Sequence, residues 1–130
     1  LEASGRGDIV VMSSTAGLIA YEGGGGYVAS KHGAHSVAAT LRLELAGRPV
    51  RVIEIAPGMV ATEEFSRKRL GSQEAADKVY AGVEKPLTAA DCAEAVVWTL
   101  TRPHHFNVDL MVIRPIAQAA QHKVARNQGL

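Results

Sequence analysis

One cysteine, no long apolar run and almost no net charge limit what this sequence can encode. Cys92 is the single cysteine among 130 residues, so no intrachain disulfide forms, which fits the reducing cytoplasm that we predict for the protein. Fourteen basic and thirteen acidic residues leave a net charge of +1, too little for the basic surface of a nucleic-acid-binding protein. No apolar run approaches the ~20 residues of a membrane span. We therefore predict neither a nucleic acid nor a membrane as partner.

An initial methionine is also missing. The sequence begins "LEASGRGDIV" and enters an apolar segment almost at once. We expect this chain to start partway into a longer protein.

Three apolar segments predict buried β-strands, over residues 8–14, 51–57 and 109–115. Between the first two, apolar residues recur at spacings of three and four from Tyr27 to Leu45, which predicts an amphipathic helix that Gly47 and Pro49 end. A second helix should begin after Thr88, where Asp91 completes a capping box. We also expect residues 73–80 to be partly helical.

The alternation of strands and helices predicts an open α/β fold with a parallel sheet and right-handed crossovers. The first strand, residues 8–14, is too apolar for an exposed edge, which proteins normally protect with charge or proline. We expect a further strand, absent from these 130 residues, to pair with its outer side.

Three polar residues form a candidate catalytic group. Tyr27 and Lys31 are four residues apart, which places them on one face of a helix, about 6 Å apart along its axis. A neighbouring ammonium stabilises a phenolate, and such a tyrosine can exchange a proton with an alcohol or carbonyl oxygen. Ser14 ends the first strand, and the glycine-rich loop before Tyr27 can bring its hydroxyl near the phenol. A tyrosine and a lysine at this spacing are also frequent on ordinary helices, so the pair alone is weak evidence.

These residues together resemble the short-chain dehydrogenase/reductase superfamily. Ser14, the "YVASK" segment from Tyr27 to Lys31 and the "PGMVAT" segment from Pro57 to Thr62 follow that family's Ser, Y-x-x-x-K and P-G-x-x-x-T motifs in order and interval. The match covers nearly the whole chain. The segments 64–70 and 86–115 further resemble the branch that oxidises 3-hydroxy acids and serine with NADP.

The resemblance implies an NAD(P)-dependent oxidoreductase that interconverts a secondary alcohol and a ketone. Tyr27 would be the general acid/base, Ser14 would bind the substrate oxygen, and Lys31 would stabilise the phenolate and bind the nicotinamide ribose. NADP, slightly preferred over NAD, would be held by Tyr27, Lys31, Pro57, Gly58, Val60 and Thr62. Tyr21 and Arg69 are candidates for contact with a small-molecule substrate.

The resemblance also implies the C-terminal half of a doubly wound Rossmann-type sheet, with three strands and flanking helices, as one catalytic unit over residues 1–130. No G-x-G-x-x-G turn for the cofactor pyrophosphate is present, so we expect the dinucleotide-binding half to lie upstream of Leu1. Relatives pair through the long helix, which predicts a homodimer or homotetramer; its small residues are Ala29, Gly33, Ala34, Ala38 and Ala39.

Other interpretations remain open. The chain could be a truncated, non-catalytic fragment that retains only oligomer surfaces. A Ser-Lys hydrolase is disfavoured because Ser14 lies in no G-x-S-x-G elbow. His32 and His35 suggest no metal site without further ligands, and we expect Trp98 in the core. Glu54, inside a strand, should face a polar partner that the sequence does not identify.

Overall fold

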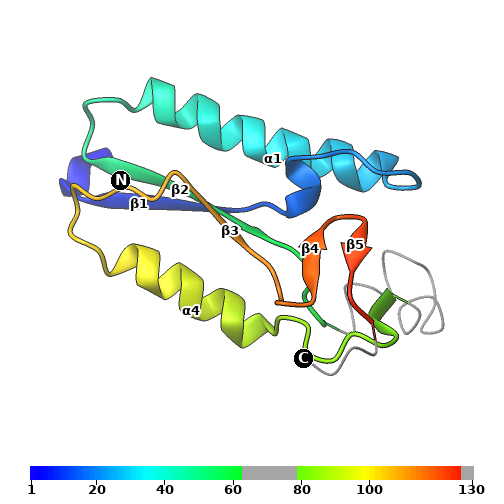
Figure 1. Ribbon diagram of the computed structural model, residues 1–130. Coiled ribbons are helices and arrows are strands. Elements are labelled where there is room, and N and C mark those ends of the chain that lie inside the picture. The colour runs from blue at the N-terminus through cyan, green and yellow to red at the C-terminus, as the bar shows by residue number, and fades with distance from the viewer. Residues whose placement is uncertain (63–78, 127–130) are drawn as a thin grey trace.

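Strands and helices alternate in the computed structural model, which describes residues 1–62 and 79–126. The described sheet has the order β1-β2-β3. Both β1 and β3 pair in parallel with the central strand β2. Helix α1 covers one face of this sheet and α4 covers the other (Figure 1). This arrangement confirms the predicted α/β class and partial Rossmann-type sheet. The elements are β1 (Gly7–Met12), α1 (Gly25–Glu44), β2 (Val50–Pro57), α4 (Ala89–Leu100) and β3 (Leu110–Ile113).

The three predicted strands lie where expected, with small differences at their ends. Ser13 and Ser14 follow β1 and lead into a short 3-10 helix, η2 (Thr15–Gly17). A hairpin, β4 (Gln118–Ala120) paired with β5 (Lys123–Val124), was not predicted. Its strands are short, and Val124 is the one β-branched residue in them, so the local strand signal is weak. The hairpin lies beyond the carboxyl end of β3 (Figure 1).

The core lies along β2. All its residues from Arg51 to Pro57 are buried, and Ile53, Ile55 and Ala56 are fully so. The inner positions of β1 are only half-buried, and within the described residues β1 pairs with β2 alone. The apolar outer edge that the sequence predicted for the first strand is therefore present in the structure.

Both helix boundaries follow from local chemistry. A Cβ on Gly24, the residue that precedes α1, would lie 2.5 Å from the ring of Tyr21, so the glycine run lets the chain pass close to that ring. After α1, the chain turns at Gly47 with a φ of 82°. The predicted capping box at the start of α4 is confirmed, because Thr88 accepts from the Asp91 N–H and Asp91 accepts from the Thr88 N–H.

Four residues that the helix patterns predicted to be buried are exposed instead. They are Val37 on α1, and Ala93, Val97 and Trp98 on α4, and Trp98 is 45% exposed. Trp98 instead packs edge-on against Phe106, and the Arg102 guanidinium lies over its ring. These side chains turn away from the sheet, because a helix carries more apolar residues here than one sheet-facing stripe can accommodate.

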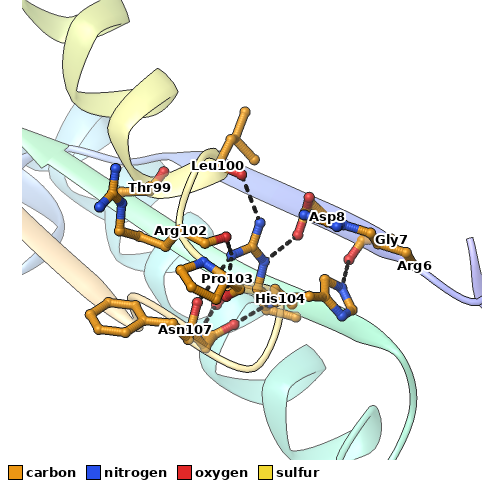
Figure 2. Close-up of polar contacts among 12 residues, drawn as sticks. Arg6, Gly7, Asp8, Thr99, Leu100, Arg102, Pro103, His104 and Asn107 are labelled. Carbon is orange, nitrogen blue, oxygen red and sulfur yellow. Dashed lines mark hydrogen bonds and ion pairs between the residues drawn. The ribbon is translucent and has the colours of Figure 1, made fainter.

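The amino end of β2 is fixed by one buried arginine. Arg51, 4% exposed, donates through Nε to Asp8 on β1 and through Nη2 to the carbonyl of Leu100, the last residue of α4. Its Nη1 donates to three carbonyls in the loop that follows, those of Arg102, Pro103 and Phe106. Figure 2 shows Asp8, Leu100 and this loop converging around the guanidinium. The arginine thus joins β1, β2 and the end of α4.

No helix within residues 1–62 and 79–126 is long and apolar enough to cross a membrane. The helix predicted around residues 73–80 lies almost wholly outside the described residues.

Candidate active site

A cavity of about 460 Å³ opens at the carboxyl ends of β1 and β2. In parallel α/β sheets this edge is where ligands bind. Nearly every candidate site residue predicted from the sequence lines this cavity. Its lining includes Ser14, Tyr21, Tyr27, Lys31, Pro57, Gly58, Val60 and Thr62.

Ser14 is held at the cavity wall by the end of β1. Its extended backbone precedes η2, and its side-chain oxygen accepts a hydrogen bond from the Ala16 N–H at 3.1 Å. This bond uses the oxygen as acceptor, so the hydroxyl hydrogen can still donate to a substrate oxygen. The structure thus places a preoriented donor where the strand ends.

Tyr27 and Lys31 enter the same cavity from the first two turns of α1. The Lys31 Nζ lies 5.8 Å from the centroid of the Tyr27 ring, and it donates a long hydrogen bond of 3.4 Å to the Met12 carbonyl. The helix therefore presents the phenol and the ammonium side by side, as their spacing predicted.

Close packing sets α1 against η2. A Cβ on Gly17 would lie 2.7 Å from the Lys31 carbonyl oxygen. Because backbone lies on both sides of this contact, only glycine fits at position 17 without moving one of the two elements. The distance between the serine and the helix that carries Tyr27 and Lys31 depends on this packing.

The turn that follows β2 forms the floor of the cavity and is tightly bonded. The Gly58 N–H donates to the Ile113 carbonyl and the Ala61 N–H to the Leu87 carbonyl. The Val60 carbonyl accepts from the Tyr80 hydroxyl at 2.6 Å. These contacts fix the segment from Pro57 to Thr62 between β3 and the start of the α4 region.

The β4–β5 hairpin forms a wall that sequence reasoning missed. Gln118 is buried and its Oε1 accepts from the Met59 N–H at 2.8 Å. Gln121 accepts from the Thr15 hydroxyl at 2.8 Å and so ties the hairpin to η2. Nothing in the local sequence marks these two glutamines, because their partners lie far away along the chain.

Among the described residues that line the cavity, the charged ones are cations, Lys31 and Arg126. Arg126 is held by the carbonyls of Val79 and Ala81, to which its Nη1 donates. Cys92 also lines the cavity, and its burial raises the pKa of the thiol. A cavity with this charge balance favours an anionic ligand.

The remaining sequence candidates fall elsewhere. Arg69 lies outside the described residues. His32 bonds to the Val28 carbonyl in its own helix, whereas His35 contacts Glu54. No cluster of three or more His, Cys, Asp or Glu side chains suited to a metal occurs in the described parts of the chain.

Comparison with known families identifies the chain. The family model described as short chain dehydrogenase matches residues 1–73. The chain belongs to the short-chain dehydrogenase family. This agrees with the motifs at Ser14, Tyr27 and Lys31, all of which lie inside the matched segment.

Two curated relatives illustrate the similarity. A Mycobacterium tuberculosis protein named as an uncharacterized oxidoreductase is 51% identical over 123 residues, which cover 94% of this chain and 48% of the relative. An NADP-dependent 3-hydroxy acid dehydrogenase of Escherichia coli is 39% identical over 115 residues, which cover 88% of this chain and 46% of the relative. The chain thus spans about half the length of the curated relatives it matches.

Solved structures show the same fold. The closed form of a serine dehydrogenase complexed with NADP⁺ matches with a TM-score of 0.86 and 34% identity, over 98% of this chain and 51% of that chain. A serine dehydrogenase from Escherichia coli matches with a TM-score of 0.70 and 32% identity, over 90% of this chain and 44% of that chain. Both contain a further half that these 130 residues do not align with.

Proposed function

We propose that the chain carries the catalytic half of an NAD(P)-dependent dehydrogenase that interconverts a secondary alcohol and a ketone. The observation that carries this proposal is the convergence of Ser14, Tyr27 and Lys31, from the end of β1 and the start of α1, on one cavity. The oxidoreductase names of the relatives support the reaction class.

The described cavity suits the nicotinamide end of such a cofactor. Lys31 and the turn from Pro57 to Thr62 lie on its wall and floor, and the cations Lys31 and Arg126 favour an anionic molecule. When bound, the nicotinamide ring supplies the site that accepts or delivers the hydride. NADP is the preferred candidate, because the named relatives include an NADP-dependent enzyme and an NADP⁺ complex.

Three side chains would take part in the proton transfer. In alcohol oxidation the Tyr27 phenolate accepts the proton of the substrate hydroxyl, and in ketone reduction the phenol returns it. The Lys31 ammonium beside the ring stabilises the phenolate form. The Ser14 hydroxyl donates to the same substrate oxygen and stabilises the negative charge that develops there.

The substrate we propose is a small hydroxy acid, in line with the 3-hydroxy acid and serine dehydrogenases among the relatives. Arg126 on the cavity wall can meet a substrate carboxylate. Tyr21, which also lines the cavity, remains a candidate substrate contact. The same role for Arg69 rests on its sequence position alone.

We also propose that residues 1–130 are the C-terminal half of one Rossmann-type domain, whose dinucleotide-binding half precedes them. The half-length coverage of the relatives and the unpaired apolar edge of β1 support this. The alternative is a non-catalytic fragment. Calorimetric titration of the 130-residue chain with NADPH tests the division: a Kd below about 10 μM, roughly −7 kcal/mol, would show that the cofactor cradle lies within these residues.

A homodimer or homotetramer is proposed for the full-length protein. Leu43 is 81% exposed on α1 and Val37 is exposed on the same helix, so apolar surface is available there for a second copy. Ala38, one of the small residues expected at a helix pair, is instead fully buried within the chain. A monomeric mass in sedimentation at micromolar concentration would contradict the proposal.

The decisive experiment is Tyr27→Phe in the full-length protein. Removing the phenolic oxygen should lower kcat by ~10² to 10⁴-fold with a serine or 3-hydroxy acid substrate, while the Kd for NADPH changes less than about twofold. Lys31→Ala is the matched comparison, because it should weaken NADPH binding as well as turnover. Activity of Tyr27→Phe within threefold of wild type would exclude the assigned role.

A further inference from the structure

Glu54 is an acid in β2, the most buried of the described strands. It is 1% exposed, and its neighbours along β2, Ile53 and Ile55, are fully buried. Removing a carboxylate from water costs several kcal/mol unless other hydrogen bonds replace those of the solvent. An apolar residue would fit this buried position of the sheet equally well. The hydrogen-bond partners of Glu54 therefore indicate its role.

Two side chains from neighbouring elements bind this carboxylate. The Ser13 hydroxyl donates to Oε2 at 2.7 Å. The His35 Nδ1 lies 2.7 Å from Oε1 and 2.9 Å from Oε2. Toward an ionised carboxylate, which only accepts hydrogen bonds, His35 donates from Nδ1. Glu54 therefore joins the end of β1 to α1 across the central strand.

The two partners adjoin the proposed reactive groups. Ser13 directly precedes Ser14, and His35 lies one helical turn after Lys31. The direct link between the same elements from Lys31 to the Met12 carbonyl is longer, at 3.4 Å. The short polar connection between the serine and the helix that carries Tyr27 and Lys31 thus runs through Glu54.

We propose that Glu54 is a positioning residue that sets where the Ser14 hydroxyl lies relative to the Tyr27 phenol. Glu54 is not among the residues that line the cavity, so it acts through Ser13 and His35 rather than by touching substrate. The inference rests on the proposed function, because the relative position of the two groups matters for turnover only if both act on one substrate oxygen. A misplacement of about 1 Å can cost ~10²-fold in rate.

Glu54→Gln in the full-length protein tests this, because it keeps the shape of the side chain and removes its charge. The amide oxygen can accept from only one of the two partners, and the amide nitrogen must donate to the other, so one hydrogen bond is reversed and the charge that strengthens both is lost. We expect kcat to fall between ~10- and ~100-fold, with the KM for NADP changed less than about twofold.

Two substitutions of His35 test whether the hydrogen bond to Glu54 sets kcat. His35→Leu removes the donor and should lower kcat as Glu54→Gln does. His35→Asn retains an N–H close to the position of Nδ1 and should recover most of that loss. Asp8→Asn, at the other end of the sheet, is the control for general destabilisation and should leave kcat within about twofold of wild type.

All variants are assayed at a temperature where circular dichroism shows them folded. A kcat within twofold of wild type for both Glu54→Gln and His35→Leu, alongside an active wild type that Tyr27→Phe inactivates, would overturn the positioning role and leave the proposed function standing.

Hydrogen exchange followed by mass spectrometry gives a readout independent of turnover. The backbone of residues 13–18 should exchange at least about tenfold faster in Glu54→Gln than in wild type, and in Asp8→Asn it should not. If the wild type oxidises neither serine nor a 3-hydroxy acid, the proposed function fails. In that case equal exchange in the two variants would overturn the positioning role, and faster exchange in Glu54→Gln alone would support it.

Discussion

Strand β2 buries two charged side chains, Arg51 near its amino end and Glu54 in its middle, and their roles differ. Arg51 and Glu54 are three residues apart, so they point to opposite faces of the strand. Arg51 donates to Asp8 and to backbone carbonyls at the end of α4 and in the loop beyond it (Figure 2). Glu54 accepts from two side chains that adjoin the cavity. Arg51 thus binds mainly backbone, whereas Glu54 binds the side chains of Ser13 and His35, next to the residues that we propose to be reactive.

This difference has an electrostatic counterpart. The hydrogen bond from Arg51 holds the pKa of the Asp8 carboxyl below its ordinary value. Asp8 is therefore paired at neutral pH and takes no part in the proposed chemistry, so changing the Arg51–Asp8 pair should alter stability alone. Changing Glu54 should alter turnover.

The largest effect should come from removing the guanidinium. Arg51→Met leaves the Asp8 carboxylate and several buried carbonyls without their donor, so the free energy of unfolding should fall by about 3–5 kcal/mol. Urea unfolding of the full-length protein measures this. Where the variant is folded, its kcat should stay within about twofold of wild type. A tenfold loss of kcat in folded protein would remove the distinction between the roles of Arg51 and Glu54.

A smaller effect on stability, with a clear effect on turnover, is expected from Gly17→Ala. The new Cβ would meet the Lys31 carbonyl at 2.7 Å and push η2 away from α1. We expect a destabilisation of about 1–3 kcal/mol, and a loss of kcat because Ser14 moves with η2.

Gly33→Ala is the matched control for Gly17→Ala. A Cβ at position 33 meets no heavy atom within 4 Å, and alanine favours a helix over glycine by roughly 0.5–1 kcal/mol. This variant should be slightly more stable than wild type. Equal kinetics in the two variants would show that the packing of η2 on α1 does not set the geometry of the site.

Among the destabilising variants, the smallest effect is expected from Asp8→Asn. The amide oxygen can still accept from Arg51, so only the charge is lost, at a cost of about 1 kcal/mol at neutral pH. Because the folded-state pKa of Asp8 lies below the ordinary value of 3.8, the stabilisation is complete above that pH. It disappears as the pH falls through the lower folded-state pKa. Unfolding curves of the variant and wild type should therefore converge in acid, and a constant difference down to pH 2 would contradict the pairing.

Local sequence determined the order of the elements and the central pair of the site. Apolar segments mark the buried strands, spacings of three and four mark the helices, and the capping box of Thr88 and Asp91 involves neighbours only. Tyr27 and Lys31 are neighbours for the same reason, since one helical turn separates them. These features could be predicted because a few consecutive residues contain all the interacting groups.

Tertiary structure alone decided which distant residues complete the site. Thr15 and Gln121 are 106 residues apart in sequence, yet their bond places the β4–β5 hairpin on the cavity. The partners of Glu54 lie 41 and 19 residues away, so a lone acid in an apolar strand could be noticed but not explained. The exposure of Trp98 likewise depends on which helix face meets the sheet. Such contacts follow from how the crossovers bring the strands into register, and no short stretch of sequence contains that information.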